Sequence, residues 1–249
     1  MPDSLRPATR RIAMWSGPRN LSSALMRSFS ARADCAVRDE PFYAAYLAAT
    51  DRPHPMAAET IAAGETDPAR VAHACATEER GVPVLYQKHM THHMLPGMDL
   101  GWTAALTNAF LIRAPEAVLA SYSVKHEAVD QQDIGFEKQA ELFAREADRL
   151  GHAPVVVDAE DILRDPAAML PALCAALDIP WDAAMLSWPE GPHPDDGIWA
   201  AHWYGSLWSS TGFAPWSPRP LPVLGAAEAR LAEAARPHYE RLHAHRIRP

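Results

Sequence analysis

The chain has 249 residues, 48% of them hydrophobic and 22% charged, which is enough apolar sequence to bury the core of one large α/β domain. Its formal net charge of −8, from 31 acidic and 23 basic residues, supplies no global basic field, so nucleic acid is not expected as a partner. No apolar leader core follows the charged N-terminus, and no apolar run is long enough to span a bilayer. With three widely spaced cysteines and no CxxC pattern, the sequence predicts a cytoplasmic protein without a membrane partner.

Short β-type runs alternate with longer helical runs, which is the pattern of βα units around a parallel sheet. Strands are predicted at Arg11–Trp15, Ala36–Arg38, Val82–Gln87, Ala109–Ile112 and Val155–Val157. Helices are predicted at Leu21–Arg32, Pro68–Arg80, Pro115–Lys125, Phe136–Leu150, Asp165–Leu177 and Gly225–Ala244. We therefore expect an α/β fold with a parallel sheet of about five strands flanked by helices, with ligands bound at the carboxyl ends of the strands.

Residues 1–249 are expected to form a single domain that contains one irregular segment, Ser187–Pro222. Five tryptophans lie in this segment among many Pro, Gly and Ser residues, at Trp188, Trp199, Trp203, Trp208 and Trp216. This composition is typical of a lid-like loop, and a static aromatic cap on the core is the alternative. A second stretch, Thr50–Asp67, is expected to be a surface excursion.

The turn after the first strand has the features of an anion site. Ser16-Gly-Pro-Arg-Asn-Leu-Ser-Ser23 connects the strand to a helix, and N–H groups at a helix start favour phosphate or sulfate. Arg19 adds positive charge and the serines add hydroxyl donors. The G-x-x-x-x-G-K-[ST] consensus is absent, which argues against a nucleoside triphosphatase. The alternative is a turn in which Asn20 or Ser22 only caps the helix.

Arg113 ends the fourth predicted strand, with Pro115 two residues later and Ser121, followed by Tyr122, eight residues later. This spacing resembles the 3′-phosphate site of sulfotransferases, which has an arginine, a proline and a serine followed by an aromatic residue at the same intervals. The chain thus resembles a small, bacterial-type member of that family over roughly residues 11–180. The resemblance implies a P-loop-type fold and 3′-phosphoadenosine 5′-phosphosulfate (PAPS) as the sulfuryl donor.

The resemblance also implies which residues hold the donor. Arg113 and Ser121 are expected at the 3′-phosphate, and the turn after the first strand at the 5′-phosphosulfate. The full donor-binding set is Gly17, Pro18, Arg19, Asn20, Leu21, Ser22, Ser23, Arg113 and Ser121. An arginine fork beside a hydroxyl suits a phosphate dianion. Arg19 replaces the loop lysine usual in the family and is our candidate for the leaving-group side, whereas a surface salt bridge is the alternative for Arg113.

A third match follows the fifth strand. Val155-Val-Val-Asp-Ala-Glu-Asp-Ile-Leu-Arg-Asp-Pro166 resembles a strand, acidic pair and Asp-Pro sequence common in the family. We expect these acids to cap the next helix or to orient basic groups rather than to take part in catalysis.

Sulfuryl transfer needs an in-line nucleophile and an acceptor for its proton, a task that suits histidine. The third predicted strand ends in a polar run that contains Lys88, His89, His92 and His93. His89 is the favoured base and His92 the next, with Lys88 as a further catalytic candidate. His93 is expected to cap the loop or to satisfy core carbonyls. The three histidines lack H-x-x-x-H spacing, so no metal is expected.

Glu40 follows the second strand in Asp39-Glu-Pro-Phe-Tyr43 and resembles a Glu-Pro seen in bacterial relatives. It is a candidate base or substrate anchor. A buried carboxylate paired with Arg19 or Arg113 is the equally weighted alternative.

Together these features predict a transferase that moves a sulfuryl group from PAPS to a hydroxyl or amine of a small-molecule acceptor. An ATP-dependent small-molecule kinase is one alternative, because two anion sites also suit ATP. The missing P-loop lysine and magnesium aspartate count against a kinase. A noncatalytic nucleotide-binding module is the other alternative, and neither the acceptor nor the oligomeric state is indicated.

Overall fold

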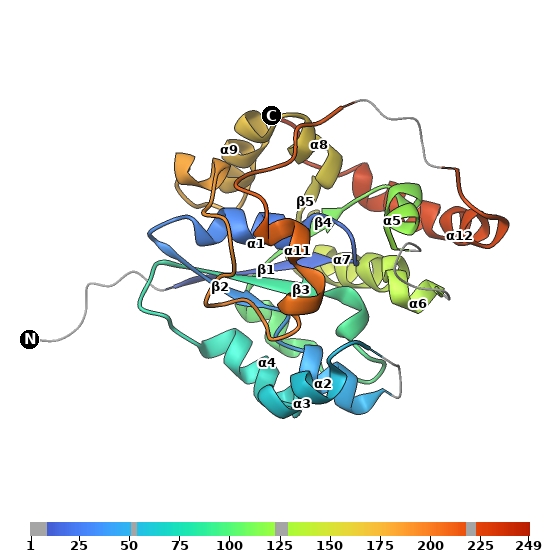
Figure 1. The fold of residues 1–249 in the computed structure, drawn as a ribbon, viewed down its shortest axis with the longest axis horizontal. Coiled ribbons are helices and arrows are strands. Elements are labelled where there is room, and N and C mark those ends of the chain that lie inside the picture. The colour runs from blue at the N-terminus through green and yellow to red at the C-terminus, as the bar shows by residue number, and fades with distance from the viewer. Residues whose placement is uncertain (1–8, 51–53, 123–128, 218–222) are drawn as a thin grey trace, which may run out of the picture.

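The computed structural model describes residues 9–50, 54–122, 129–217 and 223–249 (Figure 1). In this part of the chain the strands are β1 (Arg10–Ser16), β2 (Cys35–Asp39), β3 (Val84–Met90), β4 (Thr107–Ile112) and β5 (Val155–Asp158). They form one parallel sheet in the order β2-β3-β1-β4-β5. The predicted five-stranded α/β fold is confirmed. The third strand differs from its prediction because it continues past Gln87 to Met90.

Helices cover both faces of the sheet (Figure 1). One face is covered by α1 (Ser22–Ser30), α8 (Ala159–Arg164) and α9 (Pro166–Ala176), and the other by α4 (Pro68–Thr77), α7 (Phe136–Leu150) and α12 (Ala226–His243). The remaining α-helices are α2 (Tyr43–Ala49), α3 (Ala57–Ala63), α5 (Pro115–Tyr122), α6 (Gln131–Ile134), α10 (Ala200–Trp203) and α11 (Gly205–Trp208). Short 3₁₀ turns lie at η1 (Thr91–His93), η2 (Gly101–Ala105) and η3 (Ala183–Leu186).

The predicted helices differ from those of the structure between β2 and α4. The expected excursion at 50–67 contains α3, and the sequence analysis missed α2 altogether. The helix expected to reach Lys125 is described as far as Tyr122, and its predicted end lies outside the described residues.

The central strand shows why the sheet is buried on both sides. Ile12 and Met14 pack with α1 and α9, whereas Ala13 and Trp15 pack with α4 and α7. Successive side chains of a strand point to opposite faces, and parallel sheets carry apolar residues on both. All four side chains are at most 1% exposed, so β1 is a rigid support for the turn that follows it.

Asp158 and Asp165 begin the two helices after β5. Asp158 accepts a hydrogen bond from the Glu160 N–H at the start of α8, and Asp165 accepts one from the Ala168 N–H at the start of α9. The capping role expected for these acids is confirmed.

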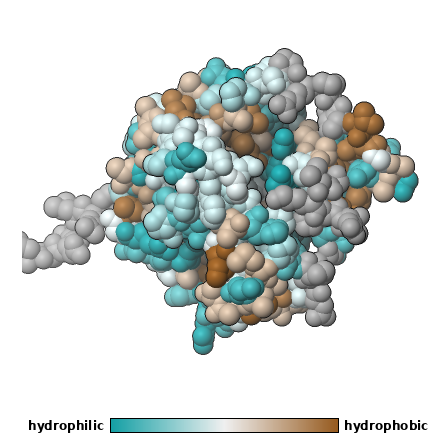
Figure 2. Space-filling view, in the orientation of Figure 1, coloured by the Kyte–Doolittle hydropathy of each residue, from teal (hydrophilic) through white to brown (hydrophobic). Residues whose placement is uncertain are grey.

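Apolar side chains form only small separate patches on the face seen in Figure 2, among larger hydrophilic areas. None of the helices in the described ranges combines the length and the apolar composition needed to cross a bilayer. The cysteines Cys35, Cys75 and Cys174 are all free.

Gly17 allows the end of α6 to approach the turn after β1. A Cβ atom at this position would lie 2.6 Å from the Ile134 carbonyl oxygen. We expect Gly17→Ala to lower the free energy of unfolding by about 1–3 kcal/mol, the usual cost of overpacking. Urea unfolding followed by circular dichroism measures this change. The control is Gly205→Ala, where a Cβ meets no atom within 4 Å. Equal midpoints for the two variants would contradict the close approach.

Candidate functional site

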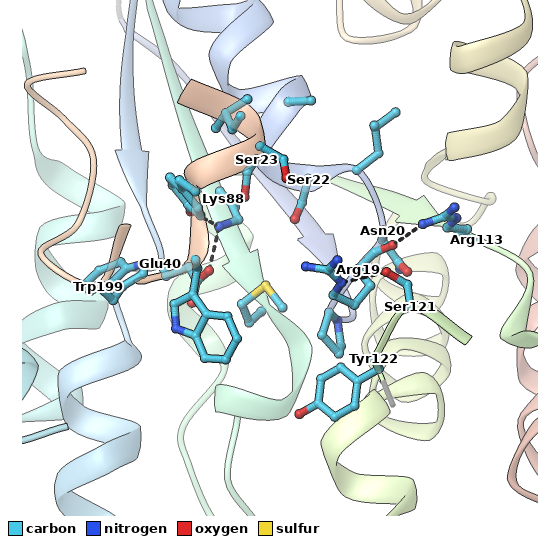
Figure 3. A pocket seen from close by; sticks show the side chains of 18 of the residues that line it. Arg19, Asn20, Ser22, Ser23, Glu40, Lys88, Arg113, Ser121, Tyr122 and Trp199 are labelled. Carbon is cyan, nitrogen blue, oxygen red and sulfur yellow. Dashed lines mark hydrogen bonds and ion pairs between the residues drawn. The ribbon is translucent and has the colours of Figure 1, made fainter. Parts of the chain in front are cut away.

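A cavity of about 490 Å³ opens at the carboxyl ends of β1, β2, β3 and β4. Its walls come from the turn after β1, the ends of three further strands, α5 and residues 199–214 (Figure 3). The cavity brings together most of the predicted site residues, namely Pro18, Arg19, Asn20, Leu21, Ser22, Ser23, Glu40, Lys88, His92, Arg113 and Ser121. Two predicted site residues do not line the cavity. These are Gly17, which is buried within the turn, and His89.

Helix α1 begins at this cavity without a side-chain cap. Its N-cap residue is Leu21, with φ 68°, and its first turn contains no acidic residue. The alternative in which Asn20 or Ser22 caps the helix is therefore contradicted. The first N–H groups of α1 lack a side-chain acceptor, and Ser22 and Ser23 add hydroxyls beside them, which is an arrangement suited to an anion.

Arg19, Ser121 and Arg113 lie together at one end of the cavity (Figure 3). Arg19 Nε donates to Ser121 Oγ at 2.8 Å, and Arg113 Nη1 donates to the Arg19 carbonyl oxygen at 2.7 Å. Burial lowers the pKa of Arg113, and the neighbouring Arg19 charge lowers it further. Within the described residues no carboxylate forms a salt bridge with either arginine, so the salt-bridge alternative for Arg113 is not supported.

Two buried side chains, Gln139 and Asn20, stabilise the positions of these groups. Gln139 of α7 donates to the carbonyl oxygens of Trp15 and Leu111 at 3.0 and 2.9 Å, which ties the ends of β1 and β4 together. Asn20 is 1% exposed, with its amide 3.3 Å from the Leu111 oxygen. Gln139 therefore holds the turn after β1 and the strand end at Arg113 close to each other.

The other end of the cavity carries a buried ion cluster. Asp39 of β2 lies opposite Lys88 of β3 in the parallel register, and the two side chains meet. Lys88 Nζ donates to Asp39 Oδ1 at 2.9 Å, to Glu40 Oε1 at 2.6 Å and to the Tyr204 hydroxyl at 2.6 Å. The Tyr204 hydroxyl in turn donates to Asp39 Oδ2 at 2.8 Å. Glu40 is thus paired with Lys88, not with Arg19 or Arg113 as one alternative held.

The cluster shifts the pKa values of its members. Burial raises the pKa of Glu40, and the Lys88 charge offsets only part of this effect. Burial opposes the charge of Lys88, but Asp39 and Glu40 outweigh it and leave the pKa of Lys88 well above its ordinary value. Lys88 is therefore a permanent cation, and Glu40 is a carboxylate whose affinity for a proton is increased.

The structure contradicts the expectation that His89 is the base. His89 is 1% exposed, and its ring stacks on that of Trp15 with centroids 4.6 Å apart. Its Nε2 lies 3.1 Å from Gln87 Oε1. Burial lowers the pKa of His89 to about 3. Because β3 continues to Met90, strand alternation places Lys88 and His89 on opposite faces of the sheet, and only Lys88 faces the cavity.

His92 and His93 both line the cavity. His93 is 2% exposed and stacks between Tyr43 and Tyr46, with ring centroids 5.0 and 4.8 Å away. Its Nε2 is 3.9 Å from Glu40 Oε2, and neither ring nitrogen has a hydrogen-bond partner among the described residues. The expectation that His93 satisfies core carbonyls is therefore wrong.

Comparison with known proteins decides the family. The model of the sulfotransferase domain family matches residues 10–246. The chain belongs to this sulfotransferase family. The predicted five-stranded parallel sheet flanked by helices is accordingly the fold of a chain of this family.

Two proteins of Arabidopsis thaliana, described as branched-chain-amino-acid aminotransferase-like proteins 1 and 2, are 34% and 35% identical to this chain over 94% and 85% of its length. The chain spans only 42% and 37% of their lengths.

Solved structures share the fold at low identity. The sulfotransferase domain of the Synechococcus PCC 7002 olefin synthase has a TM-score of 0.53 and 17% identity, covering 94% of this chain and 96% of that one. A sulfotransferase from Alicyclobacillus acidocaldarius has a TM-score of 0.54 and 14% identity, covering 97% and 98%.

The cavity is bordered by residues 199–214, which include α10 and α11. Trp199, Trp203 and Tyr204 line it, whereas Trp188 is 4% exposed and packs against Phe213. One part of the segment therefore forms a wall of the cavity, and another part is an aromatic cap on the core. The last residues of the predicted segment, 218–222, lie outside the described residues.

This wall is anchored to α1 by a buried ion pair. Arg27 Nη2 donates to both carboxylate oxygens of Asp196, at 2.9 and 2.8 Å, and the two side chains are 4% and 5% exposed. Trp208 Nε1 donates to the same carboxylate at 3.0 Å.

We expect Asp196→Asn to lower the free energy of unfolding by about 3–5 kcal/mol, because it leaves Arg27 buried without its counter-charge. Denaturant unfolding measures the loss. The control is Asp195→Asn, whose side chain is 32% exposed and reaches Arg80 only at 3.5 Å. A loss no larger than that of the control would show that the pair does not anchor the wall.

Backbone strain concentrates at the same cavity. Five non-glycine residues in the described part of the chain have positive φ, and three of them, Arg19, Leu21 and Glu40, line the cavity. Such conformations persist where surrounding contacts hold them and gather at functional sites. Here the turn after β1 and the exit of β2 are the strained segments, and they carry the candidate anion site and the candidate base.

Sequence reasoning missed Tyr43 and Tyr204 as residues of this site, and it gave His93, which lines the cavity, only a structural role. Tyr43 could have been found from the sequence, because it follows Glu40 closely at the exit of a strand, where site residues are expected. Tyr204 reaches Lys88 from 116 residues away in the chain, and no local pattern indicates that contact.

Proposed function

We propose that this sulfotransferase transfers the sulfuryl group of PAPS to a hydroxyl or amine of a small-molecule acceptor. The observation that carries the proposal is one cavity with two opposite ends. Arg19 and Arg113, without carboxylate partners in the described chain, lie at one end, and the Glu40–Lys88 pair lies at the other.

The cationic end suits a donor with two separate phosphate groups. The uncapped start of α1 with Ser22 and Ser23 would receive the 5′-phosphosulfate, and Arg113 with Ser121 would receive the 3′-phosphate. Arg19 belongs to the turn that precedes α1, and it contacts Ser121 through its side chain and Arg113 through its carbonyl oxygen. From this position it would stabilise the charge that develops on the leaving phosphate.

Besides this charge stabilisation, the transfer step requires positioning of the reactants and one proton acceptor. The acceptor oxygen or nitrogen attacks the sulfur, the bond from sulfur to the bridging oxygen of the 5′-phosphate breaks, and its electron pair leaves with 3′-phosphoadenosine 5′-phosphate (PAP). The acceptor's proton passes to Glu40. Oε1 of Glu40 is held by Lys88, while Oε2 accepts no hydrogen bond from any described residue and remains free for this proton.

An activity assay separates this proposal from its alternatives. The protein is incubated with PAPS, or with ATP and Mg²⁺, each with a mixture of small alcohols and amines, and nucleotide products are separated by chromatography. We expect PAP release from PAPS that persists in EDTA, and no ADP release from ATP. ADP release alone would favour a kinase, and no product from either donor would favour a noncatalytic module.

A further inference from the structure

The buried ion cluster at the end of the cavity opposite Arg19 holds two carboxylates and one ammonium. Lys88 Nζ lies 2.9 Å from Asp39 Oδ1 and 2.6 Å from Glu40 Oε1, and the three side chains are at most 13% exposed. No other lysine or arginine of the described residues pairs with either carboxylate. With both carboxylates ionised, the cluster therefore carries one negative charge that Lys88 does not balance, and such a charge is costly to bury.

The histidine beside the cluster does not supply the missing positive charge. His93 Nε2 is 3.9 Å from Glu40 Oε2, but burial lowers the pKa of His93 well below its ordinary value, so its ring is neutral. A cation in the cavity could balance the cluster instead.

Glu40 is the carboxylate that a molecule in the cavity can reach. Its side chain lines the cavity and is 13% exposed, whereas Asp39 is not part of the lining. Oε1 is held by Lys88, while Oε2 accepts no hydrogen bond from any described residue and is not enclosed by protein. Lys88 has all three donors engaged, so it offers none to an anion.

Aromatic rings form the wall of the cavity at this end. Tyr43 of α2 and Trp199 and Tyr204 of the segment 199–214 line the cavity, and Figure 3 shows Trp199 on the same side as Glu40. The rings of Tyr43 and Trp199 meet edge to face, with centroids 4.9 Å apart. The Lys88 ammonium lies 5.1 Å from the centroid of the Tyr204 ring. Aromatic faces attract cations, so these walls reinforce the preference of the carboxylate for a positive group.

We propose that the acceptor is an amine that binds as its ammonium ion, and that its nitrogen is the atom that is sulfated. The ammonium donates to Glu40 Oε2 and lies against the aromatic wall. An alcohol could donate the same hydrogen bond but would leave the charge of the cluster unbalanced. This inference rests on the proposed function, because it names the substrate class of the same site.

The transfer to an ammonium ion balances in charge and protons. Glu40 Oε2 takes one proton, and the lone pair released on nitrogen attacks the sulfur while the bond from sulfur to the bridging oxygen breaks. The electron pair of that bond leaves with PAP. The sulfated nitrogen then loses a second proton to water, and Glu40 returns the first to solvent. Sulfation of an ammonium ion therefore releases two protons, whereas sulfation of an alcohol releases one.

The test compares amines with alcohols of the same skeleton, namely cyclohexylamine with cyclohexanol, benzylamine with benzyl alcohol, and 2-phenylethylamine with 2-phenylethanol. Each is titrated calorimetrically at neutral pH into protein saturated with PAP, where binding is measured without turnover. In at least one pair we expect the amine to bind about tenfold or more tightly than the alcohol, because hydrogen bonds between charged groups are the stronger ones. No preference for the amine in any pair, absence of binding included, would overturn the inference.

Turnover identifies the sulfated atom. With PAPS in place of PAP, the preferred amine should give its N-sulfated product in mass spectrometry, with two protons released for each PAP in a weakly buffered assay. An amine that binds tightly but is not converted would contradict the assignment of its nitrogen as the nucleophile.

Variants assign the preference to the carboxylate. Glu40→Gln removes the charge and keeps the size of the side chain, so the preference for the amine should fall towards unity. Glu59→Gln, which changes an exposed carboxyl on α3, should retain the full preference and so separates the effect of Glu40 from the net negative charge of the chain. An undiminished preference in Glu40→Gln would contradict the inference, and if that variant does not fold, the wild-type comparison alone decides.

Binding of PAP and conversion of the alcohols test the proposed function separately. If PAP binds and only alcohols are sulfated, the proposed function stands and the amine inference fails. If PAP does not bind, the donor assignment fails, and the same pairs are titrated into the free protein so that the amine inference is still decided.

Discussion

Replacing Arg113 by alanine is expected to raise the dissociation constant for PAP on the order of 100-fold, because charge-assisted hydrogen bonds to a phosphate contribute about 1.5–3 kcal/mol each. Affinity for ADP, which has no 3′-phosphate, should change far less. Calorimetric titration of both nucleotides measures the effect, so the expected signature is loss of the preference for PAP over ADP.

Two further variants sharpen this result. Arg113→Lys keeps the charge but not the planar fork, so it should recover only part of the PAP affinity. Arg70→Ala removes an arginine whose side chain is 75% exposed, and it should leave both affinities unchanged. Because Arg113 also donates to the Arg19 carbonyl, a merely structural role would weaken PAP and ADP equally. That outcome would remove Arg113 from the 3′-phosphate site.

Replacing Glu40 by glutamine is expected to lower kcat by about 10²–10⁴-fold, the usual contribution of a general base. The amide keeps the size of the side chain and accepts from Lys88 through its oxygen, so PAP affinity should remain close to that of the wild type. Glu59→Gln, an exposed carboxyl on α3, is the control. A kcat within a few fold of the wild type would exclude Glu40 as the base.

The pH profile gives an independent test of the same residue. A base acts in its deprotonated form, so activity is lost as pH falls through its folded-state pKa. Since burial raises the pKa of Glu40 above 4.5, the acidic limb of kcat/KM should lie above the range of an ordinary carboxyl group. The limb should disappear in Glu40→Gln, and its persistence there would assign it to another group. Lys88, with its raised pKa, contributes no titration near neutral pH.

The sheet was predictable because its strands are short apolar runs, each followed by a turn signal and a helix. The error in β3 has a specific cause. Lys88 and His89 are polar residues inside a fully buried strand, and polarity normally marks the end of a strand. Lys88 is tolerated there because it donates to Asp39, Glu40 and Tyr204. These contacts are distant in sequence, and even Asp39, which lies opposite Lys88 in the register, is 49 residues away.

That Arg19, Ser22, Ser23, Arg113 and Ser121 line one cavity was also predictable, because each part of the group is local in sequence. Arg19, Ser22 and Ser23 share one turn, and Arg113 and Ser121 share one strand–helix unit. The opposite end of the cavity, around Lys88 and Tyr204, was not predictable, since it is assembled by long-range contacts. The segment 199–214 is positioned by the Arg27–Asp196 ion pair. Neither sequence periodicity nor the residues typical of turns could have predicted this pair.

The most direct test of the account is calorimetric titration of the wild-type protein with PAP, ADP and ATP in the absence of metal. If the cavity holds PAPS, PAP will bind tightly and by a wide margin over ADP, since the 3′-phosphate is the group that Arg113 and Ser121 are placed to bind. Equal affinity for PAP and ADP, or tight binding of ATP alone, would contradict the assignment of PAPS as the donor. The chain would then share the fold of sulfotransferases but not their donor.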